Sequence, residues 1–285
     1  MRDISPEVLE TLAKTRCFVL DMDGTIYLGD ELFPATIPFL NWLRSHRRTY
    51  IFATNNSSVS GADYFEKLRK MGVPLEPGQV FTSGDATIRY LKQCGPERNI
   101  FLLGTPKLHA DFEKNGFETT SAAPAYVVLG FDKTMTYESL NAACRHIRSG
   151  VSFIATHPDL NCPMPNDELL IDCGAISEAI TAATGVKPKY IGKPHTEMVD
   201  YMINLAGVEP SQMAIIGDRL STDIQAGVSN GVFSILVLSG ATSASELEAS
   251  QIQPDMVVSD LGELLQILKM VENDGANLAH SEKRR

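Results

Sequence analysis

The sequence contains no long apolar run and no paired-cysteine motif, and these absences exclude several classes of protein. No apolar stretch approaches the roughly 18 residues that a membrane-spanning helix needs, so we expect no membrane partner. The five cysteines are scattered without CxxC spacing, which predicts reduced core thiols. Residues 1–14 lack the apolar segment of a secretory signal, so we expect a cytoplasmic location.

Positively charged residues are fewer than negatively charged ones. Lysine and arginine number 25 against 35 aspartate and glutamate residues, which gives a net charge of −10. Such a surface disfavours adhesion to nucleic acid or to anionic membranes. The apolar fraction of 44% and the charged fraction of 21% are typical of a globular chain. A length of 285 residues exceeds the usual domain size of roughly 100–200, which favours two domains.

Short β-branched or aromatic runs alternate with helical patterns along the chain, and this alternation predicts a parallel-sheet α/β fold. The predicted strands are Cys17–Leu20, Thr49–Ala53, Asn99–Leu103, Tyr126–Leu129, Ser152–Ala155, Met213–Ile216 and Ser234–Leu238. Helices with an N-cap signal and a terminal glycine are predicted over Ser60–Met71, Ser83–Cys94 and Thr136–Ser149, with a crossover helix over Ala35–His46.

The most informative motif is Asp-Met-Asp-Gly-Thr, which places Asp21 and Asp23 directly after a predicted strand. Ligands of open α/β sheets bind at the carboxyl ends of strands, where an aspartate serves as a nucleophile or as a ligand for a hard cation. The alternative is an ordinary Asx turn. An EF-hand loop is excluded, because the sixth position is Ile26 rather than glycine and the twelfth is Leu32 rather than glutamate.

Two further motifs can handle phosphate. Thr54, Asn55 and Asn56 follow a predicted strand, and a hydroxyl with free backbone amides can hold phosphoryl oxygens; a simple turn is the alternative. Lys193 precedes a helix-like run, although a lone lysine is usually a solvated surface charge. A Walker A loop is excluded, because six residues separate Gly185 from Gly192 and a proline replaces the Ser/Thr.

The fourth motif is Gly-Asp-Arg-Leu-Ser-Thr-Asp, which delivers Asp218 at the end of an apolar strand and Asp223 five positions later. Alone, Asp223 also suits the N-terminal charge of a helix. In this order the four motifs resemble those of the haloacid dehalogenase superfamily, with details similar to its nitrophenylphosphatase (NagD-like) branch. That resemblance spans nearly the whole chain and implies a Rossmann-like parallel-sheet core with an inserted α/β cap of type IIA.

The resemblance also implies a role for each motif. Asp21 attacks phosphorus and becomes an aspartyl phosphate, and Asp23 protonates the leaving alcohol and later activates water. Mg²⁺ is held by a carboxylate oxygen of Asp21, the backbone carbonyl of Asp23 and the side chain of Asp218, while Asp223 orients waters. The set that binds phosphate or substrate is Thr54, Asn55, Asn56 and Lys193. Magnesium and Lys193 cancel the repulsion between the nucleophile and the phosphoryl group.

Motif spacing predicts where the second domain is inserted. Thr54 and Lys193 are 139 positions apart, far more than a continuous sheet requires. We therefore predict a catalytic core over residues 1–82 and 191–285 and an inserted cap over residues 83–190. Within the cap, His157 and Asp159 are candidate substrate contacts, although His157 stands where the branch usually has asparagine, and both suit a loop-fixing role. His195 suits a capping or surface role.

These expectations combine into a magnesium-dependent phosphatase of small-molecule phosphate monoesters. The alternatives are a phosphotransferase or phosphomutase of the same superfamily and a non-catalytic metabolite-binding regulatory protein. The sequence leaves the phosphorylated metabolite open among nucleotides, sugar phosphates and pyridoxal phosphate. Caps of the resembling branch often support dimers, so a homodimer through the cap is a further expectation.

Overall fold

The computed structural model describes residues 4–163 and 168–282, which divide into two compact units. Unit 1 comprises Met1–Phe52, Leu68–Gln79 and Met202–Arg285, and unit 2 comprises Ala53–Lys67 and Val80–Tyr201. The predicted cap over residues 83–190 falls within unit 2, but unit 2 also includes residues outside that range. The division into a catalytic core and a cap stays a prediction.

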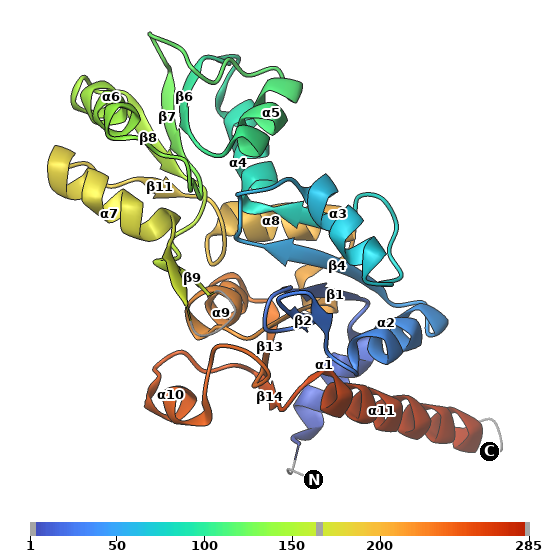
Figure 1. Cartoon of the computed structure of the whole chain (residues 1–285). Helices are drawn as coiled ribbons and strands as arrows, with labels where there is room; N and C mark the ends of the chain where they lie inside the picture. Colours follow the sequence, from blue (N-terminus) through green and yellow to red (C-terminus); the bar gives the residue numbers. More distant parts are fainter. Residues whose placement is uncertain (1–3, 164–167, 283–285) are drawn as a thin grey trace. The chain divides into compact units, whose positions relative to one another are not determined.

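Unit 1 is built around a parallel sheet with strand order β14-β13-β12-β1-β4 (Figure 1). These strands are β1 (Cys17–Leu20), β4 (Thr49–Thr54), β12 (Met213–Gly217), β13 (Phe233–Val237) and β14 (Met256–Val258). Every residue of β1 and β12 is buried, as expected for central strands covered on both faces. The predicted strands of unit 1 are thus confirmed, with shifts of at most a residue or two at their ends.

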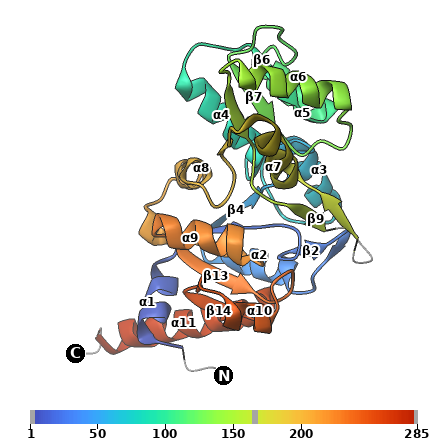
Figure 2. The same cartoon turned by 90° about the vertical axis from the view of Figure 1, so that its left-hand side faces the viewer.

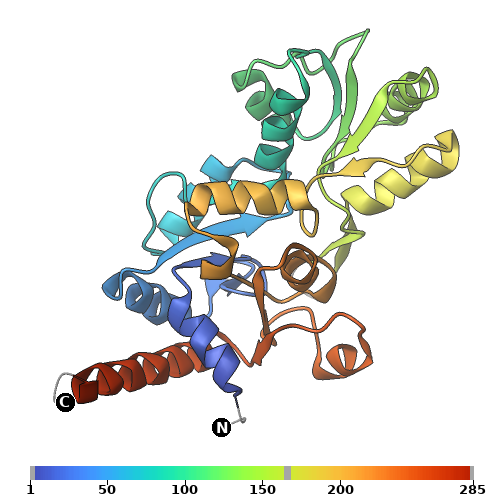
Figure 3. The ribbon, with the colours of Figure 1, turned by 180° about the vertical axis from the view of Figure 1, so that it is seen from behind.

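The helices of unit 1 pack on this sheet and on one another. Helix α2 (Thr36–Ser45) contacts α11 (Leu261–Glu282), which in turn contacts α1 (Pro6–Lys14) (Figure 3). Helix α9 (Gln225–Asn230) packs against β12 and β13. The remaining elements are the hairpin β2 (Tyr27–Leu28) and β3 (Glu31–Leu32), the short 3₁₀ helix Pro210–Gln212, the π-helical segment Leu220–Ile224, and helix α10 (Ala244–Ala249).

Unit 2 contains a second parallel sheet with strand order β11-β8-β7-β6 (Figure 2). Its strands are β6 (Ile100–Leu103), β7 (Tyr126–Leu129), β8 (Ser152–Ala155) and β11 (Lys189–Tyr190). Helices α4 (Ser83–Cys94) and α5 (Pro106–Lys114) lie on one side of it, and α6 (Tyr137–Arg148) and α7 (Cys173–Thr184) on the other (Figure 1). A core that includes Val127, Leu129, Ala143, Ile147 and Ile180 joins the sheet to α6 and α7.

The other elements of unit 2 include the end of β4 and the neighbouring strand β5 (Val80–Thr82). Helix α8 (Thr196–Ala206) follows β11, and the antiparallel hairpin β9 (Asn161–Pro163) and β10 (Leu169–Ile171) precedes α7. Helix α3 (Gly61–Lys70) begins in unit 2. Thr136 caps α6 through its side chain, as predicted, whereas α4 is capped by Thr82, one residue before the predicted cap Ser83.

Two expectations about composition can be checked in the described part of the chain. No helix there is both long and apolar enough to cross a membrane. All five cysteines are free, in agreement with reduced thiols, and burial raises the pKa of Cys173 to about 12. Cys94 is exposed, so the prediction of core thiols is wrong for this residue.

Candidate active site

In unit 1, two of the predicted carboxylates follow neighbouring parallel strands at the same edge of the sheet. Leu20 of β1 pairs with Ile216 of β12, and the amide of Asp21 donates to the Ile216 carbonyl at 2.8 Å. Asp21 therefore continues the register just beyond β1, and Asp218 comes directly after β12. The register of the sheet thus explains why residues 197 positions apart in the chain lie close together.

Asp223 joins these two residues to form a cluster of three carboxylates. Each of Asp21, Asp218 and Asp223 offers an oxygen, and the three oxygens lie within 4.8 Å of one another. Asp218 and Asp223 are buried, and the Asp223 carboxylate accepts a hydrogen bond from the amide of Arg219 at 3.2 Å. Three like charges this close repel each other, and carboxylate oxygens are the ligands that hard cations prefer. The cluster therefore fits a divalent cation such as Mg²⁺.

The backbone of unit 1 closes tightly around Asp218. Gly24 has a φ of +80°, and a Cβ at this position would lie 2.3 Å from Asp218 Oδ2. A Cβ at Gly240 would lie 2.1 Å from the same oxygen, and the amide of Ala241 donates to it at 2.6 Å. The two glycines let the main chain approach the carboxylate, which fixes its orientation in the cluster.

Asp23 lies on the exposed side of the loop that follows β1. The loop turns back on itself, because the Met22 carbonyl accepts from the Ile26 amide at 2.9 Å and the Gly24 amide donates to the Tyr27 carbonyl at 2.8 Å. Asp23 itself is exposed, whereas the residues on either side of it are buried. The role of Asp23 as an acid and base stays a prediction.

In unit 2, the structure brings Lys193 to the end of β4. Its Nζ donates to the Ala53 carbonyl at 3.0 Å, and Asn55 Nδ2 donates to the Lys193 carbonyl at 2.9 Å. Lys193 is only 2% exposed, so the alternative of a solvated surface lysine is wrong. Thr54 lies between these two contacts, and its Oγ1 accepts from the Asn56 amide at 3.1 Å.

The side chain of Asn56 belongs to its own loop. Its Oδ1 accepts from the amide of Ser58 at 2.9 Å and from the Ser58 hydroxyl at 2.7 Å, an Asx-type turn. This turn shapes the loop after β4 and leaves the Asn56 side-chain oxygen occupied. Its role in binding phosphate or substrate stays a prediction, as does that of Thr54 and Asn55.

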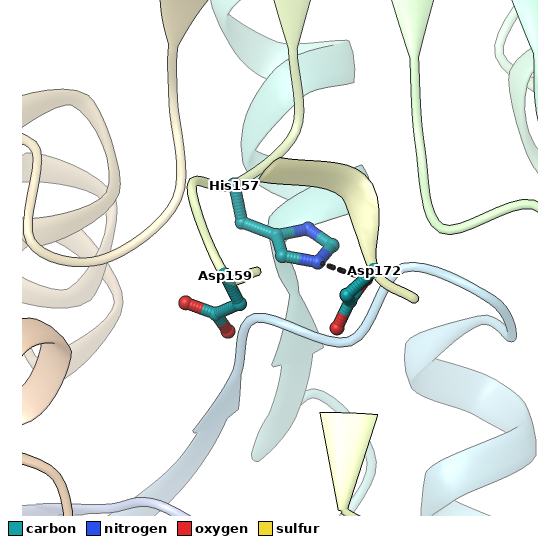
Figure 4. Close-up of side chains that lie close together, drawn as sticks. All are labelled: His157, Asp159 and Asp172. Atoms are coloured by element: carbon teal, nitrogen blue, oxygen red, sulfur yellow. Dashed lines mark hydrogen bonds and ion pairs between the residues drawn. The ribbon is translucent and has the colours of Figure 1, made fainter. Parts of the chain in front are cut away.

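Another group in unit 2 surrounds His157, which is fully buried (Figure 4). His157 Nε2 lies 2.9 Å from Asp172 Oδ1, and Nδ1 lies 2.9 Å from the Thr156 hydroxyl. Because a carboxylate only accepts, the proton of this pair sits on Nε2. Asp159 belongs to the same group, and its Oδ1 accepts from Asn55 Nδ2 at 3.2 Å. Contact of His157 or Asp159 with a substrate stays a prediction.

Sequence reasoning missed Asp172 and Ser83. Asp172 is the N-cap of α7, and its Oδ1 also accepts from the Cys173 amide at 2.6 Å. Ser83 begins α4; its hydroxyl donates to the Asn55 carbonyl and lies 3.3 Å from His157 Nδ1. Asp172 carries an ordinary helix-start signal, but nothing in the sequence links it to His157. His195 stacks on Tyr190, with ring centroids 5.7 Å apart, and burial lowers its pKa.

Two family models match two separate parts of this chain. A family model described as haloacid dehalogenase-like hydrolase matches residues 18–118, and a second model of HAD-like hydrolases matches residues 190–264. The first match contains the Asp21 and Thr54 motifs, and the second contains Lys193, Asp218 and Asp223.

Individual relatives cover most of the chain. The acid sugar phosphatase of Staphylococcus epidermidis is 32% identical over 247 residues, which are 86% of this chain and 95% of that protein. The crystal structure of a 4-nitrophenylphosphatase from Thermotoga maritima is 45% identical, with a TM-score of 0.87 over 90% of this chain and 98% of that one. NagD from E. coli K-12 is 26% identical, with a TM-score of 0.80 over 87% of this chain and 98% of that one.

Proposed function

Because the chain belongs to the haloacid dehalogenase-like hydrolase family, we propose that it is a magnesium-dependent phosphatase that hydrolyses small phosphate monoesters through an aspartyl phosphate. The observation that carries the proposal is the cluster in which Asp21 and Asp218, at the ends of two neighbouring parallel strands, meet Asp223. The names of the relatives support the same class of activity, since they include acid sugar phosphatase and 4-nitrophenylphosphatase.

Asp21 is the proposed nucleophile, and Asp23 is the proposed acid and base. A carboxylate needs no deprotonation at neutral pH, so an Asp21 oxygen forms a bond to phosphorus while the bond to the leaving oxygen breaks. Asp23 gives its proton to that oxygen. It then takes a proton from water, which attacks phosphorus and releases Asp21 and inorganic phosphate. The exposure of Asp23 supports this assignment.

The proposed magnesium ligands are one carboxylate oxygen of Asp21, the backbone carbonyl of Asp23 and the carboxylate of Asp218, with Asp223 orienting the waters. When bound, the ion supplies positive charge between the carboxylates and the phosphoryl oxygens. The tight packing of Gly24 and Gly240 around Asp218 supports a ligand held in one orientation.

The residues proposed to hold the phosphoryl oxygens are Thr54, the backbone amide of Asn55 and Lys193, and Asn56 is a further residue of the set proposed to bind phosphate or substrate. The connection of Lys193 with the segment 53–55 supports their action as one group. The positive charge of the Lys193 ammonium suits the negative charge of a phosphoryl group.

The rest of the proposal concerns substrate, assembly and location. A cap over residues 83–190 would choose among nucleotides, sugar phosphates and pyridoxal phosphate, with His157 and Asp159 as candidate contacts. Dimerisation through this cap and a cytoplasmic location complete the proposal. Light scattering of the purified protein tests the dimer, and a monomer at micromolar concentration would contradict it.

The experiment is a screen of phosphorylated metabolites and 4-nitrophenyl phosphate with and without magnesium, ranked by kcat/KM. We expect release of inorganic phosphate that needs magnesium and disappears in Asp21→Asn. The matched control is Asp260→Asn, since Asp260 is an exposed aspartate of unit 1 that accepts from two amides at the start of α11. Activity that survives in Asp21→Asn would contradict the nucleophile. Transfer of phosphate without release would indicate a phosphotransferase or mutase, and saturable binding alone a regulatory protein.

A further inference from the structure

Lys193 is tied to the segment 53–55 at both ends of the lysine residue. Its Nζ donates to the Ala53 carbonyl at 3.0 Å, and its own carbonyl accepts from Asn55 Nδ2 at 2.9 Å. Lys193 and Asn55 are both almost fully buried. Thr54 lies in the chain between Ala53 and Asn55, so the two contacts hold Lys193 against the segment that contains Thr54.

The chemistry of the contacts fixes which way the Asn55 amide faces. Its nitrogen points at two acceptors, the Lys193 carbonyl and Asp159 Oδ1, so a flipped amide would place oxygen against oxygen twice. The amide oxygen is buried, and it has no hydrogen-bond partner among the described residues. It lies against Gly192, where a Cβ would be only 2.6 Å away. The Asn55 side chain is therefore committed to donating towards Lys193 and Asp159.

Other side chains hold Asn55 itself in place. The Ser83 hydroxyl donates to the Asn55 carbonyl, and the Ser83 oxygen also lies 3.3 Å from Nδ1 of the buried His157. Asp159 accepts the second proton of the Asn55 amide. Asn55 is thus held through its main chain and its side chain. Through its hydrogen bond to the Lys193 carbonyl, it in turn holds the Lys193 main chain in place.

We propose that Asn55 is a positioning residue that acts through Lys193, in addition to any contact of its main chain with phosphate. Lysine has a long, flexible side chain, so its ammonium reaches one place only when the surroundings hold it there. By fixing the Lys193 carbonyl, the Asn55 amide keeps the ammonium at the Ala53 carbonyl, beside Thr54. The inference rests on the proposed function for its kinetic readout.

A double-mutant cycle tests the proposal with 4-nitrophenyl phosphate as the probe. Misplacing a charged group by about an ångström costs up to roughly a hundredfold, so Asn55→Ala should lower kcat/KM by about tenfold to a hundredfold. In a Lys193→Met background the same change should cost less than about twofold, because the group it positions is gone. An equal loss in both backgrounds, or no loss in either, would overturn the proposal.

Asn115→Ala is the matched control for folding. Asn115 lies in the same unit and also donates from Nδ2 to a main-chain carbonyl, that of Asp111 at 2.9 Å. A merely structural loss at Asn55 should lower the unfolding temperature as this control does, without any coupling to Lys193. If Asn55→Ala does not fold, Asp159 provides the second test. Asp159→Ala should lower kcat/KM and Asp159→Asn, which keeps an acceptor oxygen, should restore it; equal losses would overturn the proposal.

Failure of the proposed function gives a different result. If the wild-type protein hydrolyses no phosphate ester in magnesium, the phosphatase proposal falls while the positioning role is still measurable. Calorimetric titration with inorganic phosphate of the wild type, Asn55→Ala, Lys193→Met and the double variant should show the same coupling in Kd. In a crystal structure of Asn55→Ala, the Lys193 ammonium should have left the Ala53 carbonyl. An ammonium that stays within hydrogen-bond distance of that carbonyl would overturn the inference.

Discussion

Gly24→Ala is the sharpest single change for testing the site in unit 1. Gly24 has a φ of +80°, and an added Cβ would lie 2.3 Å from Asp218 Oδ2, whereas ordinary van der Waals contact begins near 3.4 Å. The carboxylate oxygen must therefore move by about 1 Å. A shift of this size in a group that orients the reaction costs on the order of a hundredfold. We expect kcat/KM for 4-nitrophenyl phosphate to fall by about that factor and the magnesium requirement to rise.

Gly72→Ala provides the matched control for this prediction. Gly72 has a nearly identical φ of +84°, but a Cβ there would meet nothing within 4 Å. Both variants pay the strain of an alanine in the left-handed region, roughly 1–2 kcal/mol, and Gly24→Ala has the clash with Asp218 in addition, so its unfolding temperature should fall at least as far as that of Gly72→Ala. Only Gly24→Ala should lose activity. If its kcat/KM stays within about threefold of the Gly72→Ala value, the reasoning that Asp218 must hold its observed orientation is wrong.

Three further predictions concern other parts of the chain. Asp23→Ala should slow turnover and let the phosphoenzyme accumulate in intact-mass spectra; fast turnover would remove its acid and base role. Asp172→Ala should lower the free energy of unfolding by about 2–4 kcal/mol, because it unpairs buried His157 and removes a helix cap, whereas the cap variant Thr136→Ala should cost about 1 kcal/mol in urea titrations; equal losses would contradict the buried pair. Burial raises the pKa of Asp111 to about 6. The folded protein therefore binds a proton at Asp111 more tightly than the unfolded chain does, and the free energy of unfolding falls as pH rises from about 4 to about 6. Asp111→Asn should therefore raise the unfolding temperature more at pH 7 than at pH 4, and an equal effect at both would contradict the shift.

The sequence predicted three of the buried parallel strands with their bounds. Cys17–Leu20, Tyr126–Leu129 and Ser152–Ala155 have the predicted bounds, because each is a short apolar run that is buried in the middle of a sheet. The strand Lys189–Tyr190 was not predictable. Its two residues carry no alternation, and they are a strand only because they pair with β8. The strand Val80–Thr82 was not predictable either, because its three residues lead directly into helix α4.

The carboxylate cluster was also within reach of sequence reasoning. Parallel strands end at one edge of a sheet, so Asp21 and Asp218 had to lie at the same edge once both strands were recognised. The polar network of unit 2 was not predictable in this way. His157 meets the N-cap of a helix 15 positions later and a hydroxyl 74 positions earlier, and no periodicity relates these residues. Such contacts follow from tertiary packing alone.

The cluster of Asp21, Asp218 and Asp223 works against the stability of the fold that holds it. Three carboxylates within 4.8 Å repel one another, and burial of two of them strengthens the repulsion because water no longer screens it. Folding alone would favour an amide in place of one aspartate, since an asparagine can accept the same backbone hydrogen bonds without the charge. A divalent cation reverses this preference, because each added carboxylate then strengthens its binding. The electrostatics of the cluster therefore fit a bound divalent cation, in line with the proposed magnesium dependence.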